Sequence, residues 1–394
     1  MPRIPDTNDH REIDLDRLHG WMKDHTQDLV DDLVALAERE TPSDDMNLLE
    51  EGGKYAEQWI LDRVGTTQHT RWHRSDMYGP VLVMDYPGST DERVMALGHF
   101  DTVFPAGTLH SWPVVIEGDR LSGPGVFDMK AGLVQMVWAV KGLDALGIPR
   151  PSVRFLLNSD EEIGSHFSRP ILEEACRDAA AVLVFEGSAA NGAIKTARKG
   201  VGLFTITAEG VEAHAGLDPT LGVSAIDEIA RVIRQLHDGA DLDRGTSINV
   251  GVVRGGSRAN VIAGTAVANL DVRVAVPEEQ DRVESLLASL TAHHPAATVS
   301  VSGGWNRPIM ERTDGNVKMY ELSRSVAERV GAELGEASVG GASDGNFVSA
   351  LGIPVLDGLG GVGNGAHTRH ENISIAALVE RALIAAGVMA SFAV

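Results

Sequence analysis

The sequence predicts an α/β protein with a mainly parallel sheet and an inserted module of strands and helices. Strands and helices alternate along much of the chain, and the strands are almost continuously apolar, as expected for strands buried on both faces. Near residue 200 the strands begin instead to alternate apolar and polar residues, which marks the start of the module. A chain of 394 residues is expected to form two or three domains.

The first half of the chain supplies the alternating elements. Residues 13–40 have the apolar spacing of one amphipathic helix. Residues 127–147 predict a helix with Asp128 at its N-cap position and Gly147 at its end. The other elements expected here are a helix at 47–65, strands at 80–86, 93–98, 152–162 and 180–188, and a helix near 168–177.

The module follows in the order βαββαβ, the ferredoxin-like arrangement. Its expected elements are strand 202–210, helix 223–237, strands 246–253 and 260–276, helix 278–292 and strand 297–302. The α/β pattern then resumes with helices at 314–331 and 344–351, strand 353–356 and helix 374–391. We therefore expect a discontinuous domain of residues 1–199 and 309–394, into which residues 200–308 are inserted.

Composition excludes several classes of function. The formal net charge of −22 repels phosphate backbones and anionic membrane surfaces, so neither nucleic acid nor membrane is an expected partner. The one cysteine, Cys176, excludes an intrachain disulfide. The N-terminus lacks the apolar segment of a secretory signal, and no apolar run approaches 18 residues. A cytoplasmic protein is expected.

Acidic and histidine side chains gather where the expected strands end. Sites in open parallel sheets form beyond the carboxyl ends of the strands. The residues at that edge are His99 and Asp101, Asp128, the run Asp160, Glu161 and Glu162, Glu186, and two histidines of a glycine-rich loop, His367 and His370. So many carboxylates need a cation, and imidazole with carboxylate suits zinc or a similar divalent ion. The number of ligands suggests two metals.

Spacing limits the roles of two pairs. His99 and Asp101 are two residues apart, so on an extended chain they face the same side, where one could ligate a metal while the other orients it. Glu161 and Glu162 are adjacent and point in different directions. One could therefore ligate a metal while the other acts as a base.

Seven motifs, in chain order, resemble those of the di-zinc aminoacylase and carboxypeptidase metallopeptidase family, and most of all its glutamate carboxypeptidase branch. They are GHFDTV, GPGVFDMKAG, NSDEEIGS, VFEGS, EAHAG, GGASDGN and GAHTRHE, between residues 98 and 371. The resemblance implies a catalytic domain of the aminopeptidase/phosphorylase-hydrolase type, formed by residues 1–199 and 309–394. It also implies that residues 200–308 form a lid and dimerisation domain, and hence that the chain is a homodimer.

The resemblance also implies residue roles. It places one zinc on His99 and Glu186, the other on Glu162 and His367, and Asp128 between them, with cobalt or manganese as alternatives to zinc. Glu161 would be the general base and Asp101 the partner of His99. His214 would reach the partner subunit's site and stabilise the oxyanion, while Asn260 and Arg307 would contact the substrate. The second histidine of GAHTRHE, His370, departs from the pattern, and we favour His367 because it directly follows the glycine-rich loop.

These residues together predict a metal-dependent hydrolase of a small substrate. The expected reaction is cleavage of the amide bond of a C-terminal or N-acylated amino acid, by a metal-activated water and a glutamate base. A deacetylase of N-acetyl amino acids, of the acetylornithine type, is one alternative. A catalytically inactive ligand-binding homologue is another, although such a protein would normally lack a ligand or the base.

Overall fold

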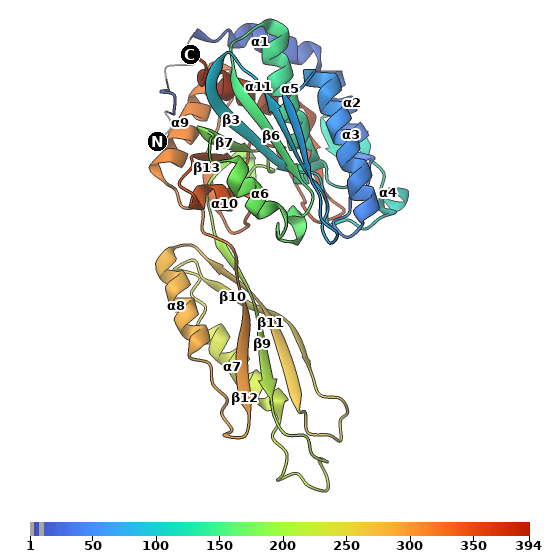
Figure 1. Cartoon of the computed structure of the whole chain (residues 1–394), viewed down its shortest axis with the longest axis vertical. Coiled ribbons are helices and arrows are strands. Elements are labelled where there is room, and N and C mark those ends of the chain that lie inside the picture. The colour runs from blue at the N-terminus through green and yellow to red at the C-terminus, as the bar shows by residue number, and fades with distance from the viewer. Residues whose placement is uncertain (1–3, 8–11) are drawn as a thin grey trace. The chain divides into compact units, whose positions relative to one another are not determined.

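The computed structural model describes residues 4–7 and 12–394 and divides the chain into two compact units (Figure 1). Unit 1 comprises Met1–Ala197, Arg312–Val339 and Ser343–Val394, and unit 2 comprises Arg198–Glu311 and Gly340–Ala342. No described helix is both long enough and apolar enough to cross a membrane.

The described part of unit 1 is built on a mixed sheet whose central strands are parallel, as predicted. In sheet order its strands are β1 (His69–His73), β2 (Val81–Tyr86), β6 (Pro151–Asn158), β3 (Thr90–His99), β7 (Ala181–Val184), β14 (Val355–Asp357), β8 (Ile194–Arg198) and β13 (Glu336–Val339). The pairs β6/β3, β3/β7 and β7/β14 are parallel, whereas β1/β2, β2/β6 and β14/β8 are antiparallel.

Register places the carboxyl ends of three central strands at one edge. Leu97 of β3 pairs with Leu156 of β6 and with Val184 of β7. All three side chains are fully buried or nearly so, which explains why these strands are apolar at every position. Residues that follow the three strands therefore emerge close together.

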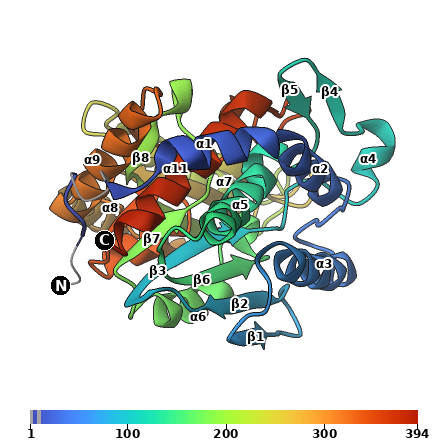
Figure 2. The same ribbon diagram turned by 90° about the horizontal axis from the view of Figure 1, so that it is seen from above.

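Helices cover both faces of this sheet (Figure 2). One face carries α1 (Leu15–Asp24), α2 (Thr26–Ala37), α3 (Met46–Val64), α5 (Ala131–Leu146) and α11 (Ile375–Ser391), and the other carries α6 (Ser168–Ala175) and α10 (Gly345–Ala350). Two further helices of unit 1 are α4 (Thr108–Ser111) and α9 (Asp314–Arg329).

Two helix predictions need correction. The expected single helix over 13–40 is two helices, because the chain turns at His25, whose ring Nδ1 lies 2.8 Å from the carbonyl oxygen of Trp21. Asp128 does not cap a helix either. It has extended backbone angles in the turn 126–130, and α5 begins only at Ala131, although Gly147 ends the helix in a left-handed conformation as expected.

A small antiparallel sheet in unit 1 was not predicted. Its order is β15 (Gly363–Asn364), β16 (Asn372–Ser374), β5 (Arg120–Ser122) and β4 (Val115–Glu117). Strands of two or three residues are too short to show a period of two. The β15/β16 hairpin holds the loop that contains His367.

Unit 2 has the predicted βαββαβ order. Its elements are β9 (Gly200–Glu209), α7 (Ala225–Asp238), β10 (Ser247–Gly255), β11 (Thr265–Val274), α8 (Pro277–Ala288) and β12 (Thr298–Arg307). The strands form an antiparallel sheet in the order β10-β11-β9-β12. One face of this sheet packs on the two helices through a separate apolar core that includes Ile206, Leu270 and Val232.

Candidate active site

Loops and strand ends of unit 1 bring six of the predicted residues to one edge of the sheet. His99 is the last residue of β3, and Asp101 follows it. Glu162 lies in a 3-10 helix, Glu161–Ile163, just after β6, and Glu186 lies two residues beyond β7. Asp128 comes from the turn before α5, and His367 from the β15/β16 loop.

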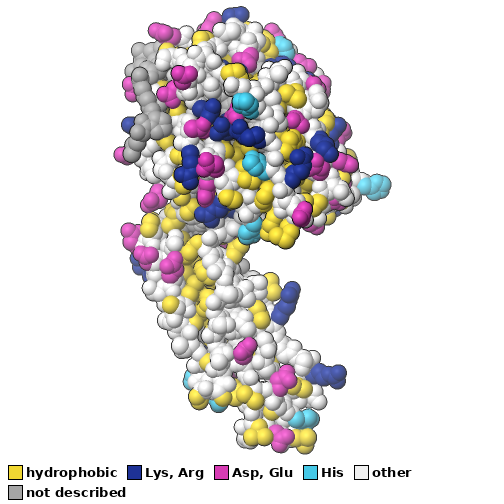
Figure 3. All heavy atoms as spheres, viewed as in Figure 1, with side chains coloured by type: hydrophobic (Ala, Val, Ile, Leu, Met, Phe, Trp, Pro, Cys, Tyr) yellow, Lys and Arg dark blue, Asp and Glu magenta, His cyan; other side chains and the backbone are white. Residues whose placement is uncertain are grey.

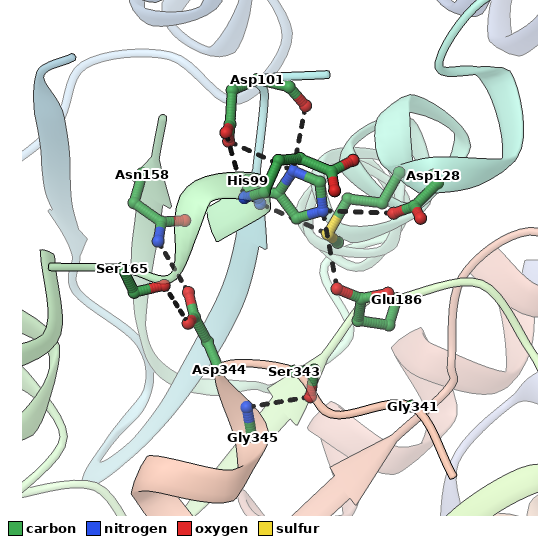
Figure 4. A network of polar contacts seen from close by, with 12 residues as sticks. His99, Asp101, Asp128, Asn158, Ser165, Glu186, Gly341, Ser343, Asp344 and Gly345 are labelled. Carbon is green, nitrogen blue, oxygen red and sulfur yellow. Dashed lines mark hydrogen bonds and ion pairs between the residues drawn. The ribbon is translucent and has the colours of Figure 1, made fainter. Parts of the chain in front are cut away.

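Three of these side chains form one group of potential metal ligands. His99 Nε2 lies 3.2 Å from Asp128 Oδ1 and 3.5 Å from Glu186 Oε1. Figure 4 shows the imidazole with these two carboxylates at Nε2 and with Asp101 at its other nitrogen. The His99 and Asp101 side chains are buried, so the ring is held on both sides.

A second group shares Asp128. His367 Nε2 lies 3.2 Å from Asp128 Oδ2 and 3.1 Å from Glu162 Oε2. The two oxygens of Asp128 therefore face different histidines. His367 has a positive φ of 62° and its side chain is about half exposed, whereas His370 is exposed and belongs to neither group.

The electrostatics show that this cluster needs positive charge. Burial opposes a charge on His99, but Asp101, Asp128 and Glu186 raise its pKa well above the usual value. Asp128 and Glu162 raise the pKa of His367 to about 10. Asp128 is buried, yet the two histidines hold its pKa below the usual value. The carboxylates therefore favour positive charge at this edge of the sheet.

The donor set fits divalent metal ions. Glu162 Oε1 is buried and has no hydrogen-bond partner among the described residues, as expected of a ligand atom prepared for a cation. Imidazole nitrogens and carboxylate oxygens without thiolates suit zinc and related borderline ions. His99, Asp128 and Glu186 could hold one ion, and Asp128, Glu162 and His367 a second.

Asp101 orients both its neighbours. Its Oδ1 and its carbonyl oxygen lie 3.3 Å and 3.1 Å from His99 Nδ1, which leaves Nε2 to face the other carboxylates. Asp101 Oδ2 accepts hydrogen bonds from the hydroxyl of Ser43 at 2.9 Å and from the backbone N–H of Glu162 at 3.2 Å. Asp101 therefore contacts a residue of each ligand group, His99 in the first and Glu162 in the second. Ser43 was not singled out from the sequence, and no motif points to it.

Glu371 holds the turn that delivers Asp128, a role the sequence did not reveal. Its buried carboxylate accepts backbone hydrogen bonds from Gly125 at 3.2 Å, Phe127 at 2.8 Å and Asp128 at 2.9 Å. Burial raises the pKa of the Glu371 carboxyl to about 7, although the hydrogen bonds from these three N–H groups lower it. Glu371 lies four residues after His367, so this loop both supplies one ligand and positions another. The sequence indicated Glu371 only through its position in the motif GAHTRHE.

Asp344 is a second buried carboxylate that the sequence did not assign. It accepts hydrogen bonds from Asn158 Nδ2 at 2.6 Å and from the hydroxyl of Ser165 at 2.5 Å (Figure 4). These bonds fasten the end of β6 and the loop after Glu162 to the segment before α10. The motif GGASDGN, which contains Asp344, is therefore a structural support of the metal-ligand cluster.

The remaining predicted residues are placed as follows. Glu161 is half-buried beside Glu162 and has polar interactions of its own. His214, Asn260 and Arg307 lie in unit 2. The loops of His214 and Asn260 are neighbours, because the backbone N–H of Ala215 donates to the carbonyl of Asn260. Both loops are largely exposed, whereas Arg307 is only 4% exposed.

Comparison with known proteins agrees with this geometry. The sequence pattern of peptidase family M20/M25/M40 matches residues 95–391, which include every residue of the two ligand groups. The chain belongs to this family. Members are metal-dependent hydrolases, and so is this chain.

Relatives in the M20/M25/M40 family extend over most of the chain. Carboxypeptidase G2 of Pseudomonas sp. (strain RS-16) is 28% identical over 364 residues, covering 91% of this chain and 88% of the relative. The succinyl-diaminopimelate desuccinylase of Gluconobacter oxydans (strain 621H) is 30% identical over 297 residues, covering 71% and 76%.

Solved structures share the M20/M25/M40 fold. Aminopeptidase PepT from Bacillus cereus ATCC 10987 superposes with a TM-score of 0.74 at 21% identity, covering 94% of this chain and 99% of that one. The YXEP protein of Bacillus subtilis, described as a dinuclear metal-binding peptidase of family M20, has a TM-score of 0.68 at 15% identity, covering 94% and 99%. The predicted α/β catalytic domain with an inserted antiparallel module is thereby confirmed.

Proposed function

We propose that the chain hydrolyses the amide bond of a small C-terminal or N-acylated amino acid with two divalent metal ions, zinc being the first candidate. The observation that carries this proposal is Asp128, whose two oxygens face His99 and His367 at 3.2 Å each. A carboxylate in this position can bridge two ions. When bound, such ions polarise a carbonyl and acidify a water molecule.

Glu161 is proposed as the general base. It lies next to Glu162 in the short 3-10 helix after β6, but it belongs to neither ligand group. A carboxylate there can take a proton from the attacking water and pass it to the leaving amine. Asp101 holds His99 in the tautomer that directs Nε2 toward Asp128 and Glu186.

His214 is proposed as the group that meets the oxyanion. Its Nδ1 accepts backbone hydrogen bonds from Gly216 at 3.1 Å and Leu217 at 3.0 Å. The ring proton is therefore on Nε2, which can donate a hydrogen bond to a developing negative charge. We propose that unit 2 is the lid and dimerisation domain, and that His214 acts in the partner subunit's site.

The substrate is proposed to carry a free carboxylate that Arg307 binds. The strand register places Asn260 at the opposite end of the unit 2 sheet, beside the His214 loop, so Asn260 is proposed to contact the substrate from the partner subunit together with His214. Arg307 donates to Asn306 Oδ1 at 3.0 Å and is almost fully buried, so its guanidinium is held in a fixed orientation. A carboxypeptidase reaction on dipeptide-like substrates is our first candidate, and the 28% identity to carboxypeptidase G2 supports it. Removal of an acyl group from an N-acyl amino acid is the second, supported by the desuccinylase relative.

One experiment separates these candidates. Metal-loaded protein is given a panel of dipeptides, N-acetyl amino acids and N-succinyl amino acids, each with its carboxylate free or amidated. We expect hydrolysis of free-carboxylate substrates only, loss of activity on chelation and recovery with zinc or cobalt. Full activity in the metal-free protein would refute the mechanism, and equal activity on amidated substrates would refute the carboxylate requirement.

A further inference from the structure

A cavity in unit 1 lies apart from the metal-ligand cluster, on the face of the sheet that α6 covers. It has a volume of about 390 Å³ and opens between β1, β2, β6 and α6. Its polar walls are formed by Arg71, His73, Arg154 and Arg177 together with the carboxylates of Glu174 and Asp178. Figure 3 shows Lys and Arg side chains gathered with Asp and Glu side chains over this part of unit 1. A group of cations is unexpected on a chain with a net charge of −22.

Arg154 is the fixed centre of this cavity. Its side chain is only 9% exposed. Arg154 Nε donates to Asp85 Oδ1 at 2.6 Å, and Nη1 donates to Asp178 Oδ1 at 2.9 Å and to the carbonyl of Ala175 at 2.5 Å. A guanidinium held at these two nitrogens loses little freedom when a ligand binds its third.

Donor groups around the cavity exceed the acceptors that the protein supplies. Among the described residues, no partner contacts Arg154 Nη2, Arg71 Nε or Nη1, or either Nη of Arg177. Arg71 and Arg154 share one carboxylate, that of Asp85, and Arg93 and Arg154 share that of Asp178. When the Arg177–Glu174 pair is added, four guanidinium groups in and around the cavity are paired with only three carboxylates. Burial and Arg71 also lower the pKa of His73, as expected in a region of positive potential.

The cavity also has an apolar wall. Val83 is buried and Ile171 half-buried, and both line it. We propose that this cavity binds a small organic dianion, with a phosphate monoester or dicarboxylate head group on Arg71, Arg154 and Arg177 and an apolar part against Val83 and Ile171. Arginine side chains bind both head groups through paired hydrogen bonds. The volume is within the range of small-ligand sites, roughly 300–1,000 Å³.

Calorimetric titration of the metal-loaded protein with phenyl phosphate, inorganic phosphate and succinate tests this inference. We expect saturable binding of phenyl phosphate or succinate, weakened by salt, and tighter binding of phenyl phosphate than of inorganic phosphate. Tighter binding of phenyl phosphate than of succinate would identify the head group as a phosphate, and the reverse order as a dicarboxylate. Arg71→Gln and Arg177→Gln should each weaken binding about 10-fold or more, since each removes charge-assisted bonds.

Matched variants distinguish this cavity from anion binding elsewhere on the protein. Arg231→Gln and Arg324→Gln remove exposed arginines that also pair with nearby carboxylates but lie outside the cavity, so binding should not change. Anions that bind the metal centre would bind the Arg71→Gln/Arg177→Gln protein as tightly as the wild type. That result, or the absence of saturable binding of all three probes at millimolar concentration, would overturn the inference. Arg177 is largely exposed, so its single variant tests the site even if the Arg71 variant folds poorly.

Discussion

Glu161 and Glu162 are chain neighbours with different surroundings. Glu162 Oε2 lies 3.1 Å from His367, whereas Glu161 belongs to neither ligand group. We predict that Glu161→Gln lowers kcat by roughly 10²–10⁴, the range for loss of a general base, and retains both metals. Glu162→Gln should lose one metal. Metal analysis beside kinetics measures both effects, and the reverse pattern would mean that the two roles are exchanged.

Glu371 acts on the metal-ligand cluster without reaching it. Removing its carboxylate leaves the buried N–H groups of Gly125, Phe127 and Asp128 without their acceptor. We predict that Glu371→Ala lowers zinc affinity by about 10–100-fold, the usual effect of residues that support metal ligands. Competition with a chelating dye measures the affinity. Glu117→Ala, which removes an exposed carboxylate of the small sheet whose strand β16 follows Glu371, is the control. Equal zinc affinity in the two variants would exclude a positioning role for Glu371.

At the scale of the elements, close packing of α5 against the segment just after β7 places two ligands. A Cβ added to Gly132 of α5 would lie 1.8 Å from the carbonyl oxygen of Phe185, the residue before Glu186. Because backbone must shift to relieve this overlap, we predict that Gly132→Ala lowers the free energy of unfolding by about 1–3 kcal/mol or more and weakens metal binding. Gly20 in α1 has open space around its Cβ position, so Gly20→Ala should instead stabilise by up to about 1 kcal/mol. Denaturant unfolding compares the two, and equal effects would contradict this account.

In unit 2, α8 is fixed by a buried carboxylate. Glu279 contacts Arg244 and Arg282 at 2.6 Å and accepts a hydrogen bond from Thr246, and Arg282 above all holds its pKa near 2. Since this pKa is below the unfolded value, the stabilisation is complete above about pH 4.5 and is lost as the pH falls toward 2. We predict that Glu279→Gln destabilises unit 2 at pH 6 and that the difference from wild type shrinks by pH 3. A difference in melting temperature that does not change with pH would contradict this assignment.

Sequence patterns predicted the elements that have a strong local pattern. They did not predict features that depend on contacts between residues far apart in the chain. The βαββαβ order of unit 2 was predictable because its strands and helices show their own periodicity, and the strands β3, β6 and β7 were predictable because they are continuous apolar runs. The gathering of candidate metal ligands at one edge of the sheet was predicted from the residues that end those strands. The extended turn at Asp128 and the roles of Ser43 and Glu371 depend on contacts between residues far apart in the chain. The break at His25 involves the nearby Trp21, but the apolar spacing of residues 13–40 continues across it and does not show it.

At the scale of the whole molecule, we predict complementation between two inactive variants. His214→Ala should be folded, metal-loaded and nearly inactive, and Glu161→Gln should be inactive for a different reason. If His214 acts in the partner's site, exchange of subunits restores one intact site in each heterodimer. Random exchange of equal amounts should then return about a quarter of wild-type activity.

Native mass spectrometry would establish that subunits have exchanged. Mixing His214→Ala with wild type serves as the control for exchange without complementation. No recovery in the mixture of the two inactive variants, despite exchange, would place His214 in its own subunit's site or outside catalysis.

The order of the ligands along the chain has a consequence for biosynthesis. His99, Asp128 and Glu186 all precede unit 2, which begins at Arg198, whereas His367 and Glu371 follow it. A nascent chain therefore carries all three residues of one ligand group before the inserted unit has been made. The turn of Asp128 stays unsupported until Glu371 has left the ribosome. The second ligand group is therefore complete only late in synthesis, and we expect a chain cut short after unit 2 to lack it.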